Sequence, residues 1–469
     1  SRGGSFSQHR RGSSSMGRFS LGVDIGSART ALSVYDHERQ CATAFEVGDD
    51  KTMPSTVFPQ RGGSIVGKRA ETRSAKQCDK VLCAHRRLLY SWVTGIDPAP
   101  HDLEMYHFST LQSRRAGAPA GGGFAYDVNG EEVPATRVVT EVMEVVCSCV
   151  LDASQPSGLL QTTREAPPEW VSCALSVPEF FPPELREIVV AAAREVLHAR
   201  LSKDIHVIAV SEGLGAAVQV ASLPPHHPRP FLLVDFGASR LSVALYNLKA
   251  EGGLVVLEEV AAASNVFACG DEVEHRVMHW CERRKPFQES MLASKPALFK
   301  LRKEVRAAIK TLTVAEEAMI EVDSVVAGND LLLMLTLEDF DRECDDIFDC
   351  IPALIQQVVQ EAGLGFPEEM VLVGGATRIL SVQKKIGRIA GLHSASVKKT
   401  VDLDRAVSQG LATVCAVVFD PPALRVPFRP TRPLVELPRR TPPSQVALYP
   451  EGDAWTPLPG RASSAGGGA

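Results

Sequence analysis

Two stretches decide the fold: residues 19–27 read FSLGVDIGS, and residues 230–239 read PFLLVDFGAS. Each is a short apolar run that ends in Asp-x-Gly. An alternating segment follows each one, RTALSVYD at 29–36 and RLSVALYNL at 240–248. This pattern predicts two strand hairpins around tight turns. Because the same unit returns after about 210 residues, the sequence predicts an internal duplication.

The two turns also suggest a chemistry. Glycines let the backbone approach phosphate groups and present N–H donors to them, and an aspartate beside them can hold the water shell of Mg²⁺. A third apolar run, EEMVLVGGATRI at 368–379, ends on paired glycines. A single Asp-x-Gly is also a common turn at a strand end. The repetition favours a nucleoside triphosphate held between two similar halves.

Composition narrows the class of protein. The 469 residues are 45% hydrophobic with a net charge of −6, which argues against a broad nucleic-acid surface. No apolar run is long enough to cross a membrane. The eleven cysteines include no Cys-x-x-Cys pair, which indicates reduced thiols in the cytoplasm rather than disulfides or a zinc site. Apolar periodicity predicts helices at about 185–197, 296–313, 337–363 and 380–390, and a buried strand at 331–335.

The two ends of the chain differ from the body. Residues 1–18 are rich in serine and arginine and lack acids, as in a disordered leader or, alternatively, an organellar transit segment. Residues 420–469 are rich in proline, which predicts a disordered tail with short extended pieces. Residues 114–123 and 224–228 are expected to be surface connections.

From about residue 20 to 419 the chain resembles the nucleotide-binding domain of the 70-kDa heat-shock chaperone family. The motifs that carry the resemblance occur in the family's order: LGVDIGS (21–27), MPSTVF (53–58), VGKRAE (66–71), SVPEFFPPELRE (176–187), VSEGLGAAV (210–218), LLVDFGAS (232–239), VLVGGATRI (371–379) and DLDRAVSQGLA (402–412).

The resemblance implies an α/β, two-lobed, actin-like ATPase fold with duplicated ribonuclease H-like subdomains around a central nucleotide cleft. The expected domain covers 19–419. Lobe I would comprise about 19–205 plus 400–419, and lobe II about 206–399. No substrate-binding domain is expected after residue 420.

The resemblance also assigns site residues. Asp24 and Asp235 would face Mg²⁺, Glu212 would position the attacking water, and Arg86 or His85 would take the place of the family's catalytic lysine. Pro178 and Arg186 match the proline and arginine of the allosteric switch. The residues expected to bind ATP or ADP are Gly26, Ser27, Gly237, Ser239, Arg240, Gly270, Asp271, Lys310, Thr313, Gly374, Gly375, Arg378 and Asp404.

Several positions depart from the family pattern. The lysine is replaced, Arg240 stands for a threonine, and Ser242 stands for a metal-side aspartate. The segment SVPEFFPPELRE stands where the family has Val-Pro-Ala-Tyr-Phe. Losing one placed donor in phosphoryl transfer commonly costs about 10²- to 10³-fold in rate. On the base side, Arg306 and Ile309 weaken the expected grip on the ribose.

Three functional hypotheses stay open. The first is a chaperone-family protein that binds ATP and Mg²⁺, hydrolyses ATP weakly or not at all, and works in protein folding with a J-domain protein and a nucleotide-exchange factor. The second is a non-hydrolysing module of a ribosome-associated chaperone complex. The third, more remote, is a small-molecule kinase of the same superfamily.

A histidine pair is a separate feature. His275 and His279 are four residues apart in EVEHRVMHWCERR, with Cys281 nearby, and such a pair can bind a metal on one helix face. The stretch has no accompanying carboxylate motif and aligns to an ordinary helix of the family. We therefore expect an ordinary helix here rather than a metal site.

Overall fold

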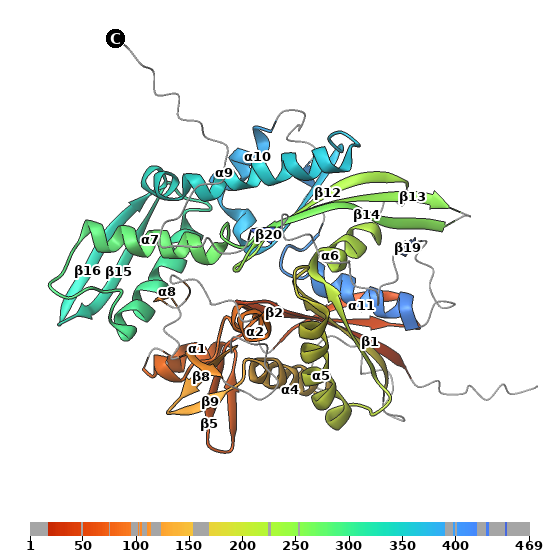
Figure 1. Ribbon diagram of the computed structural model, residues 1–469, viewed down its shortest axis with the longest axis horizontal. Coiled ribbons are helices and arrows are strands. Elements are labelled where there is room, and N and C mark those ends of the chain that lie inside the picture. The colour runs from red at the N-terminus through yellow and green to blue at the C-terminus, as the bar shows by residue number, and fades with distance from the viewer. Residues whose placement is uncertain are drawn as a thin grey trace, which may run out of the picture.

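The computed structural model describes residues 17–419, apart from gaps at 48–49, 75, 95–101, 103, 106–109, 114–122, 153–167, 224–226, 252–253, 390–396 and 399–400, together with 428–430 and 446–447. Two lobes lie one above the other, with a long sheet in each (Figure 1). The two-lobed α/β fold expected from the sequence is confirmed. Within the described residues, none of the helices combines the length and the apolar composition that a membrane crossing needs.

The sheet of lobe I has the strand order β11-β10-β1-β2-β3, with β4 also paired to β2. Its strands are β1 (Arg18–Ile25), β2 (Arg29–Asp36), β3 (Cys41–Phe45), β4 (Met53–Pro54), β10 (Glu169–Val177) and β11 (His206–Ser211). Three antiparallel strands, β1 to β3, are continued by two parallel ones.

The sheet of lobe II repeats this plan, with the order β18-β17-β12-β13-β14-β19 and with β20 paired to β14. Its strands are β12 (Arg229–Phe236), β13 (Leu241–Glu251), β14 (Leu254–Asn265), β17 (Glu369–Val373), β18 (Val397–Lys398), β19 (Phe428–Pro430) and β20 (Val446–Ala447). The antiparallel β12–β13–β14 set is again continued by parallel strands. The predicted duplication is therefore confirmed at the level of strand order.

Two of the expected boundaries differ in the structure, and the expected tail includes two short strands. Strand β11 pairs in parallel with β10, so the lobe I sheet extends past residue 205 to Ser211. The expected leader is too long, because Arg18 already pairs with Glu169 at the start of β1. In the expected disordered tail, β19 and β20 pair with β14, as the short extended pieces that were anticipated. Residues 1–16 and the rest of 420–469 lie outside the described residues.

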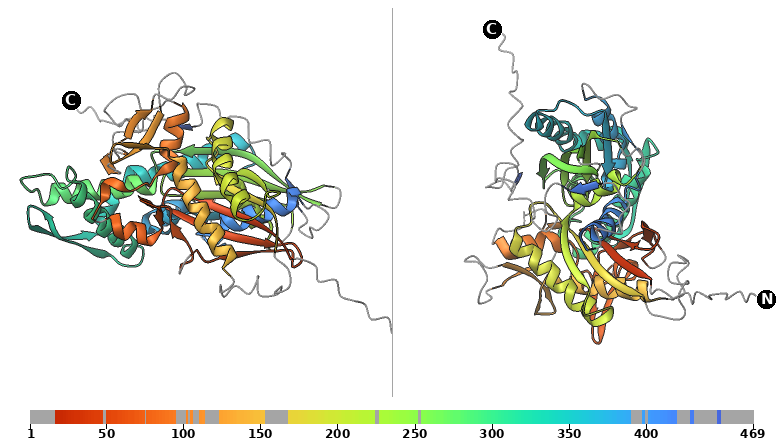
Figure 2. Two further views of the ribbon diagram at one scale, coloured as in Figure 1. Left: turned by 90° about the horizontal axis from the view of Figure 1, so that it is seen from below. Right: turned by 90° about the vertical axis from the view of Figure 1, so that its right-hand side faces the viewer.

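Helices and small sheets complete the lobes (Figure 2). Lobe I has α1 (Lys68–Ser74), η1 (Cys78–Lys80), α2 (His85–Thr94), α4 (Thr136–Leu151), α5 (Pro183–Arg200), α6 (Glu212–Ala221) and α11 (Ala406–Phe419), with strands β5 (Val57–Gln60), β6 (Gly63–Val66), β7 (Thr110–Ser113), β8 (Gly123–Val128) and β9 (Glu131–Val133). Lobe II has α7 (Gly270–Arg284), α8 (Lys295–Thr311), α9 (Leu337–Ala362), η2 (Gly375–Arg378) and α10 (Leu380–Gly387), with strands β15 (Glu317–Val326) and β16 (Asn329–Thr336).

Helices α6 and α11 join the sheets at the centre of the molecule. A Cβ at Gly410 of α11 would lie 1.7 Å from the carbonyl oxygen of Gly215 of α6, so the two backbones touch. Ser211 caps α6, since its Oγ accepts a hydrogen bond from the backbone N–H of Leu214 at 3.2 Å. This cap fixes where the helix begins, and Glu212 is its first residue.

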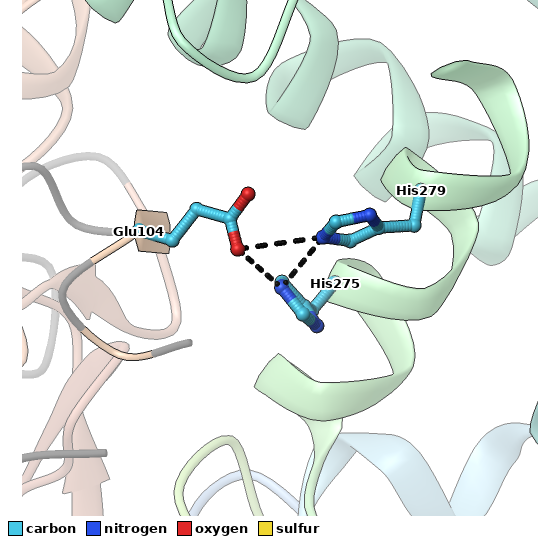
Figure 3. Close-up of side chains that lie close together, drawn as sticks. All are labelled: Glu104, His275 and His279. Carbon is cyan, nitrogen blue, oxygen red and sulfur yellow. Dashed lines mark hydrogen bonds and ion pairs between the residues drawn. The ribbon is translucent and has the colours of Figure 1, made fainter. Parts of the chain in front are cut away.

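One short segment of lobe I reaches across to lobe II. It lies between α2 and β7, and its Glu104 carboxylate contacts His275 and His279 on α7 (Figure 3). Its neighbour Met105 is buried in the core of lobe II. The lobes are thus linked by this contact at α7 as well as through α6 and α11.

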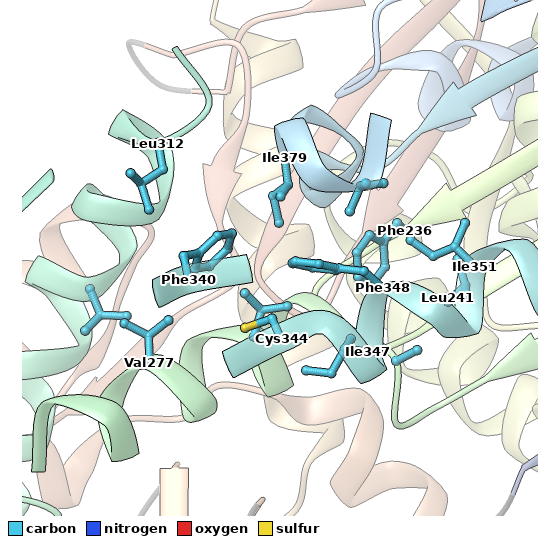
Figure 4. Close-up of a cluster of buried hydrophobic side chains, with 14 of the residues drawn as sticks. Phe236, Leu241, Val277, Leu312, Phe340, Cys344, Ile347, Phe348, Ile351 and Ile379 are labelled. Atoms are coloured by element: carbon cyan, nitrogen blue, oxygen red, sulfur yellow. The ribbon is translucent and has the colours of Figure 1, made fainter. Parts of the chain in front are cut away.

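The largest core lies under the lobe II sheet. The buried face of α9 carries Phe340, Cys344 and Phe348, which pack with residues of β12, α7 and η2 (Figure 4). Thr336 caps α9, and Gly363, at φ 65°, ends it. The buried strand expected at 331–335 is present as β16, but only one of its faces is buried: Leu331 and Leu335 are buried, whereas Leu332 is 56% exposed. A two-stranded hairpin covers the core with only one face.

Candidate functional site

A cleft of about 990 Å³ lies between the lobes, where the two Asp-x-Gly turns face each other. Asp24 and Asp235 are the penultimate residues of β1 and β12, and each pairs across its hairpin, with Ala31 and Ser242 respectively. The cleft is lined by nearly all of the predicted site residues: Asp24, Gly26, Ser27, Arg86, Glu212, Asp235, Gly237, Ser239, Arg240, Gly270, Lys310, Thr313, Gly374, Gly375, Arg378 and Asp404.

Glu212 is clamped between two arginines at the centre of this cleft. Arg86 Nη1 donates to Oε1 of Glu212, and Arg240 Nη2 donates to Oε2. All three side chains are at least nine-tenths buried. Both oxygens of this carboxylate are thus engaged by cations.

Of the two candidates for the place of the family's lysine, Arg86 is the one that lines the cleft. Its Nη2 donates to Ser176 Oγ at 2.8 Å and lies 3.5 Å from Asp24 Oδ1. His85, the other candidate, is not among the residues that line the cleft and is only 2% exposed. Burial lowers the pKa of Arg86 to about 10, which still leaves the guanidinium charged at neutral pH. Burial lowers the pKa of His85 to about 3, so its ring is neutral.

The two aspartates differ in their surroundings. Asp24 accepts a hydrogen bond from Ser176 Oγ at 2.6 Å. Asp235 has a weaker partner, Arg240 Nη2 at 3.5 Å, and burial raises its pKa to about 6 despite that neighbour. A divalent cation beside Asp235 would therefore offset the cost of burying its charge.

Glu179 completes the charge network. Its Oε2 accepts from Arg240 Nη1, and its Oε1 accepts the backbone N–H of Gly213 at 2.9 Å, at the N-terminus of α6. Burial alone would raise the pKa of Glu179, but the Arg240 guanidinium and the Gly213 N–H together hold it below its usual value. In this network, four carboxylates surround two guanidiniums, which leaves an excess of negative charge around Arg86 and Arg240.

The two switch residues hold the loop that carries Glu179. Arg186 is fully buried and donates to the carbonyl oxygens of Phe181 and Glu179, both at 2.6 Å. The carbonyl of Pro178 accepts the N–H of Phe181 at 3.2 Å, which closes the turn. Pro178 and Arg186 therefore stand behind the cleft, and they connect to it through Glu179 and Arg240.

The end of the cleft where the sequence analysis expects the nucleoside is formed by β17, η2 and α8. Gly374 has φ 84°, and a Cβ there would lie 2.5 Å from the carbonyl oxygen of Phe236, so only glycine fits. Arg378 makes a double hydrogen bond with Asp404 at 3.0 and 2.8 Å on the rim. Lys310 is exposed, and Thr313 Oγ1 donates to its carbonyl at 2.8 Å.

Asp271 lies elsewhere. Its carboxylate is buried outside the cleft lining, 3.2 Å from Arg302 Nη2 and 3.9 Å from Arg87 Nη2. Since Arg87 belongs to α2 of lobe I, Asp271 helps to tie the lobes together. The expectation that it binds nucleotide directly is wrong for this arrangement.

The residues present fit a Mg²⁺–nucleotide. Ser27 Oγ, in the first turn, is buried and has no hydrogen-bond partner among the described residues. Buried hydroxyls usually have such a partner, and a phosphate oxygen bound at this turn would supply one. The glycine turns give backbone donors. Asp24 and Asp235 offer the carboxylates that Mg²⁺ takes through its water shell.

The model of the Hsp70 protein family matches residues 20–425. The chain belongs to the Hsp70 family. Among curated relatives, the chain is 24% identical over 406 residues to the heat shock 70 kDa protein 2 of Paracoccidioides lutzii. The aligned region covers 85% of this chain and 57% of the relative. The chain is 22% identical over 413 residues to the heat shock cognate 70 kDa protein 3 of Dictyostelium discoideum, covering 87% of this chain and 61% of that one. This Hsp70 chain therefore spans about three fifths of the length of these relatives.

The sequence did not predict three polar residues that the structure places in charged clusters. Ser176 and Glu179 lie in the SVPEFF motif, and the acid in place of alanine was a signal for Glu179, but its partner Arg240 is 61 residues away. Glu104 lies in a stretch without any motif. Only the fold brings it to His275 and His279.

Proposed function

We propose that this Hsp70-family chain binds ATP and ADP with Mg²⁺ between its lobes and that hydrolysis is weak or lost. The proposal of nucleotide binding rests on the glycine turns, the unpartnered Ser27 hydroxyl and the carboxylates of Asp24 and Asp235, all of which line the cleft. Mg²⁺, when bound, would neutralise phosphate charge next to Asp24 and Asp235. Arg378 and Asp404 would bound the nucleoside end.

One observation supports the loss of hydrolysis: both oxygens of Glu212 are engaged by Arg86 and Arg240. A carboxylate that positions an attacking water needs a free oxygen directed at that water. Here the lone pairs point at buried guanidiniums, and displacing a buried charged partner costs about 3–5 kcal/mol. Weak or absent turnover follows for Glu212 unless the phosphates draw both arginines away.

The partners follow from the same proposal. A J-domain protein and a nucleotide-exchange factor act on such a module by reading the state of its lobes, and a ribosome-associated complex is the setting in which turnover is dispensable. Neither direct nucleic-acid binding nor membrane association is part of the proposal. The free state of all eleven cysteines supports a reducing compartment such as the cytoplasm.

The first experiment separates binding from turnover. Isothermal titration with Mg²⁺–ATP and Mg²⁺–ADP is expected to give one site per chain, and single-turnover assays with and without a J-domain are expected to show little or no phosphate release. Turnover abolished by Glu212→Gln would establish a working ATPase and overturn the proposed loss. Absence of binding at millimolar nucleotide would overturn the proposal of nucleotide binding.

A matched control guards against a contaminating ATPase. Glu289→Gln changes an exposed glutamate on the loop after α7 and should leave both readings unchanged. If the ATPase activity is the same in Glu212→Gln as in Glu289→Gln, it does not depend on Glu212. We would then assign it to another protein in the preparation. Phosphorylation of a small molecule, which defines the kinase hypothesis, would appear as ATP loss that depends on an added acceptor.

A further inference from the structure

Three side chains from the two lobes converge beside α7, outside the cleft lining. His275 Nε2 and His279 Nε2 lie 3.0 Å apart, and Glu104 Oε2 lies 3.1 and 3.4 Å from them (Figure 3). None of the three is among the residues that line the cleft. The stretch forms the helix that the sequence predicted, but Glu104 of lobe I supplies a carboxylate partner that the sequence did not show.

We propose that Glu104, His275 and His279 form a Zn²⁺ site that joins lobe I to lobe II. The distances fit this ion: Zn–N bonds of 2.0–2.1 Å place neighbouring ligand atoms of a tetrahedron about 3.3 Å apart. Two imidazoles and one carboxylate are a ligand set that zinc accepts, with a water in the fourth position. Mg²⁺ and Ca²⁺ prefer oxygen ligands throughout.

The ligands are already held in place. The two histidines are one turn apart on α7, which gives them a common face. Glu104 stands between two anchors, because Asp102 forms an ion pair with Arg87 of α2 and Met105 is buried in the lobe II core. Little ordering entropy is therefore left for a metal to overcome.

A further carboxylate, outside the three proposed ligands, lies beside His275. Nδ1 of His275 lies 3.7 Å from Glu272 Oε2, on the side where metal-binding histidines have a carboxylate that orients the ring. Cys281, which sequence alone placed near the pair, is instead buried in the lobe II core.

The site predicts a mechanical consequence. Glu104 belongs to the segment between α2 and β7 of lobe I, whereas both histidines belong to lobe II. A bound cation would resist opening of the cleft beside α7. Because metal binding requires no nucleotide, the zinc site and the proposed nucleotide function can fail independently.

The direct test titrates Zn²⁺ into the full chain after removal of metal with a chelator. One Zn²⁺ per chain is expected. Glu104→Gln, His275→Gln and His279→Gln should each weaken binding by at least tenfold, since even outer partners of metal ligands cost 10- to 100-fold. The exposed His227→Gln and Glu289→Gln are the matched controls and should bind as the wild type does.

Spectroscopy of the wild-type chain tests the metal site even if a variant fails to fold. Co²⁺ in the wild-type chain should show the visible bands of a tetrahedral site without a thiolate band, and X-ray absorption of the zinc form should show two imidazoles. A thiolate ligand, no stoichiometric binding, or binding that none of the three substitutions weakens would overturn the proposal.

Hydrogen exchange tests the link between the lobes. In the wild type, Zn²⁺ should slow exchange in both α7 and residues 102–105. In Glu104→Gln the segment 102–105 should no longer respond. Equal responses in wild type and Glu104→Gln would show that the ion does not bridge the lobes, which would also overturn the proposal.

Discussion

Arg240 and Glu179 form a buried ion pair at the centre of the cleft, and each stands where the Hsp70 pattern has an uncharged residue, threonine and alanine respectively. Arg240 is 2% exposed, and both of its terminal nitrogens are engaged, by Glu179 and Glu212. A buried arginine without this partner would be costly. The two departures therefore belong together, as one replacement that fills the cleft with its own charges.

A double-mutant cycle tests this pairing. Arg240→Thr leaves Glu179 with only the Gly213 N–H and should lower the free energy of unfolding by about 3–5 kcal/mol. Adding Glu179→Ala removes the orphaned charge and should recover a coupling energy of about 0.5–3 kcal/mol. Urea denaturation measures both. Arg283→Ala, which breaks an ion pair of an arginine that is 57% exposed, is the control and should cost about 0–1 kcal/mol. Additive effects of Glu179→Ala and Arg240→Thr would contradict the pairing.

Restoring the family's residues should restore turnover. In the Glu179→Ala, Arg240→Thr background, Arg86→Lys places an ammonium where the guanidinium now holds Glu212. Single-turnover phosphate release is expected to rise by about 10²-fold, the usual value of one placed donor. Glu212→Gln added to this triple variant should remove the gain. A triple variant that binds Mg²⁺–ATP and stays inactive would show that other departures, such as Ser242, limit hydrolysis.

His85 predicts an acid-sensitive stability. Burial lowers its pKa to about 3, and its Nδ1 has no hydrogen-bond partner among the described residues. The unfolded chain takes up a proton near pH 6.5 that the folded state refuses. The contribution to stability is therefore complete above pH 6.5 and is lost as the pH falls towards 3, by up to about 1.4 kcal/mol per pH unit.

The variant His85→Leu isolates this contribution. Between pH 7 and pH 5, its free energy of unfolding should fall less steeply than that of the wild type. Denaturant titrations at several pH values measure the slopes. His227→Gln, which changes an exposed histidine, should keep the wild-type slope. Identical slopes in His85→Leu and wild type would mean that His85 gains a proton while folded.

Gly410 predicts a strict steric limit. A Cβ on this residue would lie 1.7 Å from the carbonyl oxygen of Gly215, so Gly410→Ala must push α11 away from α6. We expect a loss of at least about 1–3 kcal/mol in urea denaturation, the usual cost of overpacking. Gly387→Ala, at the end of α10 with no atom within 4 Å of the added Cβ, should be neutral or slightly stabilising. Equal stability of the two variants would exclude close α6–α11 packing.

The sequence by itself determined the two hairpins, their repetition and the family. Local patterns suffice for this, because an apolar run that ends in Asp-x-Gly describes its own strand and turn. The turn aspartates, Glu212 and the Gly374 turn could likewise be assigned from motifs. The position of the lobe boundary could not, because the pairing of β11 with β10 joins segments that no local pattern connects.

Only the tertiary structure decided which charges meet. The sequence left open whether Arg86 or His85 lies in the cleft. The position of α2 decides this, because it brings Arg86 into contact with Glu212, 126 residues away. Glu104 meets His275 across 171 residues and two lobes. Such pairs depend on side-chain distances of a few ångströms set by packing, whereas a sequence motif records only neighbours along the chain. The chemistry of this chain therefore lies in contacts that its family pattern does not contain.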